Sequence, residues 1–310
     1  TVMIQISNLT RTFGSFTAVN NISFEVKPGE VLGFLGPNGA GKSTTMKMIT
    51  GFLTPSSGSV SVLGVNVNLD PLSAQKQMGY LPEGAPSYGD MTVLSFLKFI
   101  GSVRGFSGSE LSKRIDSVVS KVSLKGVLNQ RIETLSKGFK RRVGIAQAII
   151  HDPQVLILDE PTDGLDPNQK HQVRELIRAL AKDKIVIIST HILEEVSAVC
   201  SRALILSSGS VVFDGSPDEL AEKSKFHNAV SVKFSHEYDV MRKLESLANV
   251  FRVESDELSG LITIYPETGK TVLKQVNELI HSQDWEVEEF HVEKGRLDDV
   301  FRQVTIGGGA

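Results

Sequence analysis

A glycine-rich turn between an apolar strand and a helix constrains the fold of this chain more than any other feature. The turn follows VLGFL (31–35) and precedes a helix expected from about Lys42 to Thr50. It matches the pattern G-x-x-x-x-G-K-[ST] with Gly36, Pro37, Asn38, Gly39, Ala40, Gly41, Lys42, Ser43 and Thr44. With ordinary glycine content, a chance match in a chain of this length has odds of about one in a hundred. We therefore predict a phosphate-binding loop rather than an incidental turn.

The chemistry of this loop suits a nucleoside triphosphate together with Mg²⁺. Glycines let the backbone bend so that successive N–H groups point into one concavity and surround phosphate oxygens. The N-terminus of the following helix adds partial positive charge. Lys42 can reach the β- and γ-phosphates, and the hydroxyl of Ser43 can ligate Mg²⁺. We expect ATP and Mg²⁺ as the ligands.

Continuous apolar strands alternate with helices farther along the chain. VLILD (155–159), KIVIIST (184–190) and ALIL (203–206) read as strands, with helices near 168–182 and 191–199 between them. Strands of this composition predict a parallel sheet that is covered on both faces. Ligands of such sheets lie outside the carboxyl ends of the strands.

Two acids end the first of these strands, and a histidine follows the second. Asp159 would hold Mg²⁺, directly or through water, and Glu160 would orient and deprotonate the attacking water. Without the phosphate loop, solvated acids at a strand end would be the better interpretation. His191 would lie beside the γ-phosphate if its strand neighbours the one ending at Asp159, although a lone histidine is more often structural.

The order of these motifs resembles the nucleotide-binding subunit of ATP-binding-cassette (ABC) transporters over about residues 3–224. The resemblance implies a P-loop NTPase cassette, an α/β domain of residues 1–224 that hydrolyses ATP to ADP and phosphate. Such a cassette has a parallel-sheet core, an antiparallel β part and a helical subdomain, here at about 84–150. The family carries a motif close to Leu-Ser-Gly-Gly-Gln, and LSKGF (135–139) occupies its place.

The resemblance also assigns residues to a dimer. Cassettes of this family meet head to tail, so Ser136 and Gly138 of one chain would bind the γ-phosphate held by Lys42 of the other. Ser136 stands at a helix start, where free N–H groups attract anions. Asp166, in GLDP, resembles the loop that communicates across the dimer. Phe13, in RTFG, resembles the aromatic residue that stacks on adenine, with a core phenylalanine as the alternative.

The sequence departs from the family pattern at two places. Glu83 follows Tyr80-Leu-Pro82 where the family has a glutamine that contacts the Mg²⁺–water region and relays to the membrane partner. Glu83 could still meet the metal, but its charge would add to those of Asp159 and Glu160. The second departure puts a lysine and a phenylalanine in place of one glycine and the terminal glutamine of the five-residue motif.

The pattern changes after about Ser224. Residues 229–305 read as strand, helix, two strands, helix, strand and helix, which predicts a small α+β accessory domain over 225–305. Residues 306–310 read as a disordered tail. From 225 onward the chain carries 15 acidic and 10 basic residues, and the net charge of the whole chain is −3. We therefore expect no nucleic-acid partner.

The expected membrane role depends on a partner, since no run of about 18 apolar residues occurs in the chain. The resemblance implies a separate integral-membrane permease and a peripheral position on the cytoplasmic face of the inner membrane. Residues near 84–104 would dock on it, with Met91, Phe96 and Phe99 as candidate exposed side chains. Cys200 is the only cysteine, which fits a reducing compartment.

Both departures, and the ending over 295–301, resemble bacterial exporter-type cassettes (ABC-2-like, gliding-motility and multidrug types) with separate membrane subunits. One alternative is a soluble regulatory cassette ATPase that acts on ribosomes or DNA. A single cassette without long heptads or basic excess argues against it. An importer subunit is the other alternative, and the missing glutamine argues mildly against import.

Overall fold

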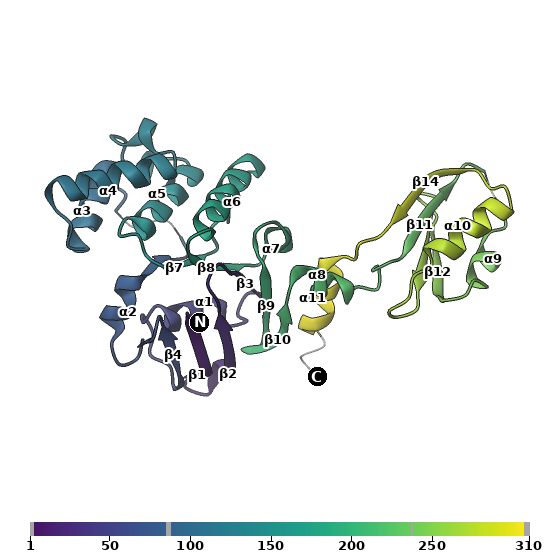
Figure 1. The fold of residues 1–310 in the computed structure, drawn as a ribbon, viewed down its shortest axis with the longest axis horizontal. Coiled ribbons are helices and arrows are strands. Elements are labelled where there is room, and N and C mark those ends of the chain that lie inside the picture. Colours follow the sequence, from purple (N-terminus) through teal and green to yellow (C-terminus); the bar gives the residue numbers. More distant parts are fainter. Residues whose placement is uncertain (1–2, 85–87, 237, 307–310) are drawn as a thin grey trace. The chain divides into compact units, whose positions relative to one another are not determined.

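The computed structural model describes residues 3–84, 88–236 and 238–306 (Figure 1). The chain divides into two compact units, Thr1–Ser216 with Thr305–Ala310, and Pro217–Val304, here called unit 1 and unit 2. Unit 1 ends at 216, whereas the sequence placed the boundary at 224. The difference arises because helix α8 (Pro217–Glu222) packs within unit 2, where Gly295 allows close approach to the carbonyl of Ala221. The expected tail after Ile306 lies outside the described residues.

A six-stranded sheet forms the centre of unit 1, in the order β10-β9-β3-β8-β7-β6. Strands β3, β7 and β8 are buried along their whole length, as expected for the interior of a parallel sheet. Only the β9–β10 hairpin is antiparallel. The strands are β3 (Val31–Leu35), β6 (Met78–Leu81), β7 (Val155–Asp159), β8 (Ile185–Thr190), β9 (Arg202–Ser207) and β10 (Ser210–Gly215).

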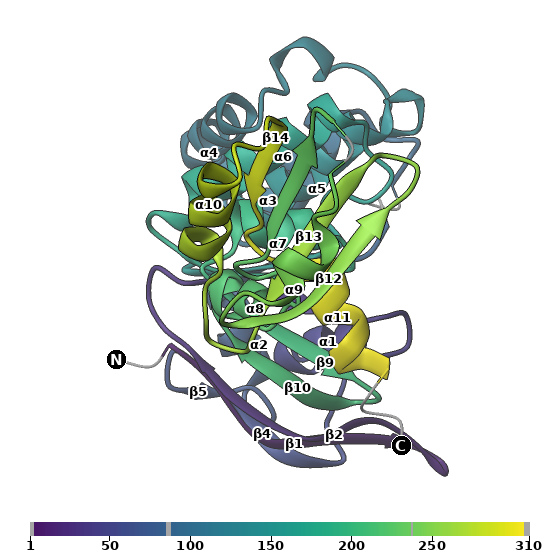
Figure 2. The ribbon, with the colours of Figure 1, turned by 90° about the vertical axis from the view of Figure 1, so that its right-hand side faces the viewer.

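A four-stranded antiparallel sheet and a group of helices lie on opposite sides of the central sheet (Figure 1, Figure 2). The antiparallel sheet shares one core with the central sheet, and the rings of Phe24 and Phe34 meet there at 5.5 Å. Its strands are β1 (Ile4–Phe13), β2 (Phe16–Val26), β4 (Ser57–Val62) and β5 (Val65–Asn66). Two helices accompany this side, α1 (Lys42–Ile49) and α2 (Pro71–Gln77). The predicted α/β cassette with a parallel core, an antiparallel part and a helical part is therefore confirmed.

The helices on the other side share a second core with the central sheet. They are α3 (Val93–Val103), α4 (Gly108–Lys121), α5 (Lys137–Ile149), α6 (Pro167–Ala181) and α7 (Leu193–Val199), with short 3₁₀ turns at Lys125–Val127 and Ile132–Thr134. Helix α5 packs directly on β6. The contact is so close that a Cβ on Gly79 would come within 2.1 Å of the carbonyl oxygen of Ala148. Among the described residues, no helix combines the length and apolar character that crossing a membrane requires.

Unit 2 is an antiparallel sheet in the order β12-β13-β11-β14 with helices on one face. Alternate residues of β13 pack toward these helices, with Ile262 and Ile264 in the core. Thr263 is therefore on the opposite face. The elements are β11 (Val230–Phe234), α9 (Met241–Glu245), β12 (Val250–Asp256), β13 (Leu261–Pro266), α10 (Leu273–Ser282), β14 (Val287–Val292) and α11 (Leu297–Ile306). Their order is the one expected from the sequence.

A partly buried histidine links the end of α5 to β6. His151 Nε2 lies 2.9 Å from the carbonyl oxygen of Met78, while its Nδ1 is buried and has no partner among the described residues. Burial, and then the nearby Arg104, lowers the pKa of His151 to about 4. A proton on Nδ1 would therefore be a buried, unpaired charge.

We predict that acid destabilises unit 1 through this histidine. The folded-state pKa is below the ordinary value of 6.5, so the stabilisation by neutral His151 is complete above about pH 6.5 and is lost as pH falls toward about 4. His151→Gln should flatten the decline of thermal stability over this interval, measured by circular dichroism. His236→Gln, which changes a side chain that is 67% exposed, should leave the decline as it is. An unchanged slope in His151→Gln would contradict this origin of the acid sensitivity.

Candidate active site

The ends of parallel strands bring the predicted site residues to one edge of the central sheet. Strand β8 pairs with β3 on one side and with β7 on the other, with Leu35 opposite Thr190 and Asp159 opposite Ser189. The phosphate loop, the two acids and His191 therefore leave the sheet side by side. The prediction for His191 required its strand to neighbour the strand that ends at Asp159. This condition is met, since β8 pairs with β7.

Close backbone contacts explain two glycines of the phosphate loop. A Cβ at Gly36 would lie 2.6 Å from the carbonyl oxygen of Leu206, and one at Gly41 would lie 2.5 Å from that of Ala18. Gly41 also has φ = 104° at the start of α1, a backbone conformation that side chains disfavour. Larger residues at either position would force the loop away from the neighbouring strands.

Lys42 folds back over its own loop. Its ammonium donates to the carbonyl oxygens of Gly36 at 2.7 Å and Pro37 at 3.3 Å, and the residue is only 6% exposed. Burial lowers the pKa of Lys42, and the nearby Glu160 and then Asp159 oppose that shift. Two backbone carbonyls of the loop are therefore the acceptors of this ammonium.

The two acids differ in surroundings. Asp159 is 1% exposed and accepts a hydrogen bond from the hydroxyl of Ser189. Glu160 begins the following turn with φ = 48°, an uncommon conformation for a side-chain residue, and its N–H donates to Ser189 Oγ at 3.1 Å. Its carboxylate Oε2 lies 2.9 Å from Nδ1 of His191. Glu160 and His191 thus form a pair in which the imidazole is half-exposed. The preceding acid, Asp159, is buried.

Helix α5 holds the turn that contains Glu83. The guanidinium of Arg141 donates to the carbonyl oxygen of Gly84 at 3.0 Å, and the amide of Gln147 donates to that of Tyr80 at 2.8 Å. Arg141 is 7% exposed. Glu83 is exposed, and its charge acts on Lys42, Tyr80 and Arg141. Glu83, which stands where the family has a glutamine, is therefore at the edge of the site, and its charge acts on both Lys42 and Arg141.

The remaining expected residues lie elsewhere in unit 1. Ser136 caps α5 by accepting from the N–H of Phe139 at 3.4 Å, and Asp166 caps α6 by accepting from that of Gln169 at 2.9 Å. Gly138 lies against Gln169, since a Cβ there would be 2.7 Å from its side chain. The two helix starts are therefore neighbours.

Phe13 is not a core residue. It ends β1 and is 47% exposed. The guanidinium carbon of Arg11 stands 4.5 Å from the centroid of its ring. One ring face is thus engaged by a cation in a surface position, and the core alternative raised for this residue is wrong.

Glu195 was not singled out in the sequence. It is 4% exposed and accepts hydrogen bonds from the hydroxyls of Thr162 and of Thr190, the latter at 2.8 Å. Thr190 Oγ1 in turn accepts from the N–H of Ile192 at 3.0 Å. Glu195 therefore connects the turn after Glu160 to the turn that carries His191. The sequence signal for Glu195 was an acid four residues after that histidine, in the helix expected near 191–199.

Comparisons with known proteins place these features in a family. A model of the family described as ABC transporter matches residues 19–163. An uncharacterized ABC transporter ATP-binding protein of Bacillus subtilis, YxlF, is 32% identical over 302 residues, which cover 97% of this chain and 92% of that protein. The chain belongs to the ABC transporter ATP-binding family.

As an ABC ATP-binding subunit, the chain is an ATPase. The Nod factor export ATP-binding protein I of Rhizobium meliloti (strain 1021) is 39% identical over 224 residues, covering 72% of this chain and 67% of that protein. A solved structure of an ATP-binding subunit of an ABC transporter superposes with a TM-score of 0.65 at 30% identity, covering 71% of this chain and 92% of that one. Both the glycine-rich loop and the acidic strand end lie within the residues that match the ABC transporter family.

We predict that Glu195→Ala destabilises this ABC subunit by about 3 kcal/mol, because two buried hydroxyls and the side chain of Arg174, 3.9 Å away, lose their acceptor. Urea unfolding followed by far-ultraviolet circular dichroism would measure the loss. Glu194→Ala, at the exposed neighbouring position, is the matched control and should change stability by less than about 0.5 kcal/mol. Equal effects of the two variants would remove Glu195 as a link between the turns.

Proposed function

We propose that this chain dimerises head to tail on ATP and powers a separate transmembrane permease, most simply an exporter. The observation that carries the proposal is the grouping of Lys42, Asp159, Glu160 and His191 at one sheet edge. It provides a phosphate-binding cation, a buried acid and an acid–imidazole pair within a single site. Hydrolysis at this site would supply the conformational change that the permease uses.

Ser43 and Asp159 are the residues that would hold Mg²⁺. No set of three or more His, Cys, Asp or Glu side chains in the described ranges is placed to hold a metal ion by itself. Mg²⁺ in nucleotide sites takes only one or two protein carboxylates and completes its shell with phosphate oxygens and water. One hydroxyl and one buried carboxylate therefore fit this ion, and its charge would stabilise the β- and γ-phosphate oxygens. Glu83 is a further candidate for that region.

Glu160 would act as the general base. It would accept a proton from water while the water oxygen attacks the γ-phosphorus, and the bond to the ADP oxygen would break. Nδ1–H of His191 would donate to the Glu160 carboxylate and orient it. The tautomer of His191 that carries its hydrogen on Nε2 would donate to the γ-phosphate instead.

The second copy of the chain would complete the site. Ser136 and Gly138 lie at the start of α5, where N–H groups and the helix dipole attract anions, and they would bind the γ-phosphate in trans. Asp166, at the neighbouring start of α6, would communicate between the two sites. Phe13, exposed beside Arg11, would stack on adenine. Lys137 and Phe139 replace the usual glycine and glutamine of the five-residue motif. Its serine and its other glycine, Ser136 and Gly138, are unchanged.

The permease would dock on α3 and the turn before it, over residues near 84–104. Phe99 is 40% exposed and Val103 is 68% exposed, and Tyr88 packs on Phe99 with ring centroids 5.5 Å apart. Phe96, expected as a candidate contact, is 2% exposed and belongs to the core. Residues 85–87 of the expected surface lie outside the described residues. Similarity to Nod factor export proteins supports export as the direction, and this docking would place the chain peripherally on the cytoplasmic face of the inner membrane.

Glu160→Gln should retain ATP binding and lower kcat by about 10²- to 10⁴-fold, because the amide cannot accept the proton of the attacking water. The variant should also accumulate as a dimer in ATP, measured by light scattering after size exclusion. A turnover rate close to that of the wild-type chain would remove Glu160 from the base role.

Lys42→Ala separates binding from chemistry in the same assay. It removes a cation from the phosphates, so ATP affinity should fall by about 10- to 100-fold and no ATP-dependent dimer should form. Undiminished affinity would contradict the assignment of the loop.

The proposal of a permease partner is tested by purifying the Glu160→Gln variant with ATP from the membranes of the cells that make it. The chains that co-purify are then identified by mass spectrometry. A multi-spanning protein in stoichiometric amount is the expected result. Phe99→Asp should release it, whereas Leu258→Asp, at a 99% exposed position of unit 2, should retain it. Recovery of ribosomal or other non-membrane partners alone would favour the regulatory ATPase instead.

A further inference from the structure

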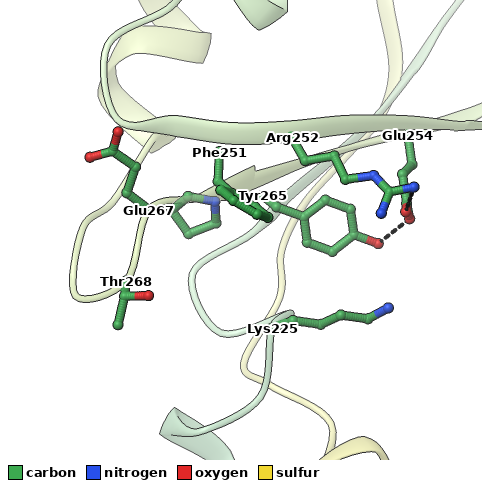
Figure 3. Close-up of a pocket in the computed structure, with 8 residues that line it drawn as sticks. Lys225, Phe251, Arg252, Glu254, Tyr265, Glu267 and Thr268 are labelled. Carbon is green, nitrogen blue, oxygen red and sulfur yellow. Dashed lines mark hydrogen bonds and ion pairs between the residues drawn. The ribbon is translucent and has the colours of Figure 1, made fainter.

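Unit 2 contains a cavity of about 380 Å³ made entirely of its own residues. Its lining residues are Lys225, Phe251, Arg252, Glu254, Tyr265, Pro266, Glu267 and Thr268. The strands β12 and β13 provide most of them, and the chain segment before β11 provides Lys225 (Figure 3). This volume is at the lower end of the range for small-molecule sites, so it suits a compound of one or two rings.

The apolar wall of the cavity is aromatic. Phe251 exposes 76% of its surface, an unusual state for phenylalanine, and Figure 3 shows its ring beside the Tyr265 ring. Tyr265 is 5% exposed, and its ring packs against that of Phe226 at 5.4 Å. Because the guanidinium carbon of Arg296 stacks on Phe226 at 3.8 Å, the Tyr265 ring is supported from behind. The exposed Phe251 ring thus offers a flat surface to a ligand, and the Tyr265 ring, almost entirely buried, lines the cavity beside it.

The charge available to a ligand is positive. Both carboxylate oxygens of Glu254 are engaged, one by the Tyr265 hydroxyl at 2.7 Å and the other by Arg252 at 2.8 Å. Figure 3 shows the Glu267 carboxylate directed away from Tyr265 and Lys225. Lys225 has no ion pair with the described residues, and its ammonium lies 5.9 Å from the centroid of the Tyr265 ring. Arg252 keeps further N–H donors, since a guanidinium has five.

We propose that this cavity binds small anionic compounds that carry a flat ring system. The ring would lie against Phe251 and Tyr265, and the anionic group would accept hydrogen bonds from Lys225 and Arg252. The site is in unit 2, so it does not depend on the nucleotide chemistry of unit 1. A cationic ligand is disfavoured because both acids of the lining are occupied or turned away.

Three probes that share one ring system separate the charge from the ring: 2-naphthoate, the neutral 2-naphthamide and the cationic 2-naphthylmethylamine. Their binding to the full chain would be measured by ligand-observed NMR, with excess ADP so that the adenine site is filled. We expect naphthoate to bind at least about fivefold more tightly than the amide, and the amine to bind least. Equal affinities, a preference for the amine or no binding of any probe would overturn the proposal.

Two variants locate the site. Lys225→Gln should weaken naphthoate by about tenfold and leave naphthamide unchanged, whereas Phe251→Ala should weaken all three probes. Both side chains are exposed, so the fold should be retained. Lys274→Gln and Leu258→Ala, at exposed positions of the same unit, are the matched controls and should change nothing. Naphthoate binding that is insensitive to Lys225→Gln would place the anion elsewhere and refute the site.

Discussion

The hydrogen-bonded ladder of β3, β8 and β7 is the constraint on which the site depends. These strands are buried throughout, so a slip of register would move apolar side chains and is strongly disfavoured. The register fixes Leu35 beside Thr190 and Ser189 beside Asp159. Asp159, Glu160 and His191 stand within one residue of these pairs, and the loop that carries Lys42 begins directly after Leu35. The geometry of the proposed site therefore depends on apolar packing between the strands.

Helix α5 connects this edge to the rest of unit 1. Its first residues carry the five-residue motif, its middle donates to the carbonyls of Tyr80 and Gly84, and its end lies against Gly79. Because these contacts are directional and backbone-mediated, a displacement of α5 would move the turn at Glu83 with it. That turn leads into α3 and the exposed Phe99. Helix α5 therefore carries Ser136 and Gly138 of the proposed trans contact at one end and holds the turn at Glu83 along its middle.

The sequence predicted the parts of the fold that depend on local pattern. Buried strands, the phosphate loop and the unit 2 element order follow from apolar runs and glycine spacing, and these signals lie within a few residues of one another. Glu195 and Arg141 could not be identified as buried links, because a charged residue on a helix is usually exposed and their partners are distant in sequence. Phe96 was similarly ambiguous, since helical periodicity gives the side of the helix but not the partner that covers it. The position of α8 in unit 2 could not be predicted, because the helix packs with residues near Gly295 that come much later in the chain.

The glutamate at position 83 is best understood together with Arg141. Three acids, Asp159, Glu160 and Glu83, stand near one another, and an additional carboxylate there would repel the phosphates of a nucleotide. Burial lowers the pKa of Arg141, while the nearby Asp163, Glu160, Asp159 and Glu83 oppose that shift. A guanidinium remains charged at all physiological pH values, so Arg141 offsets part of this negative field from inside the protein. Its hydrogen bond to Gly84 also holds the turn, and the same residue thereby compensates the charge of Glu83 and restrains its position.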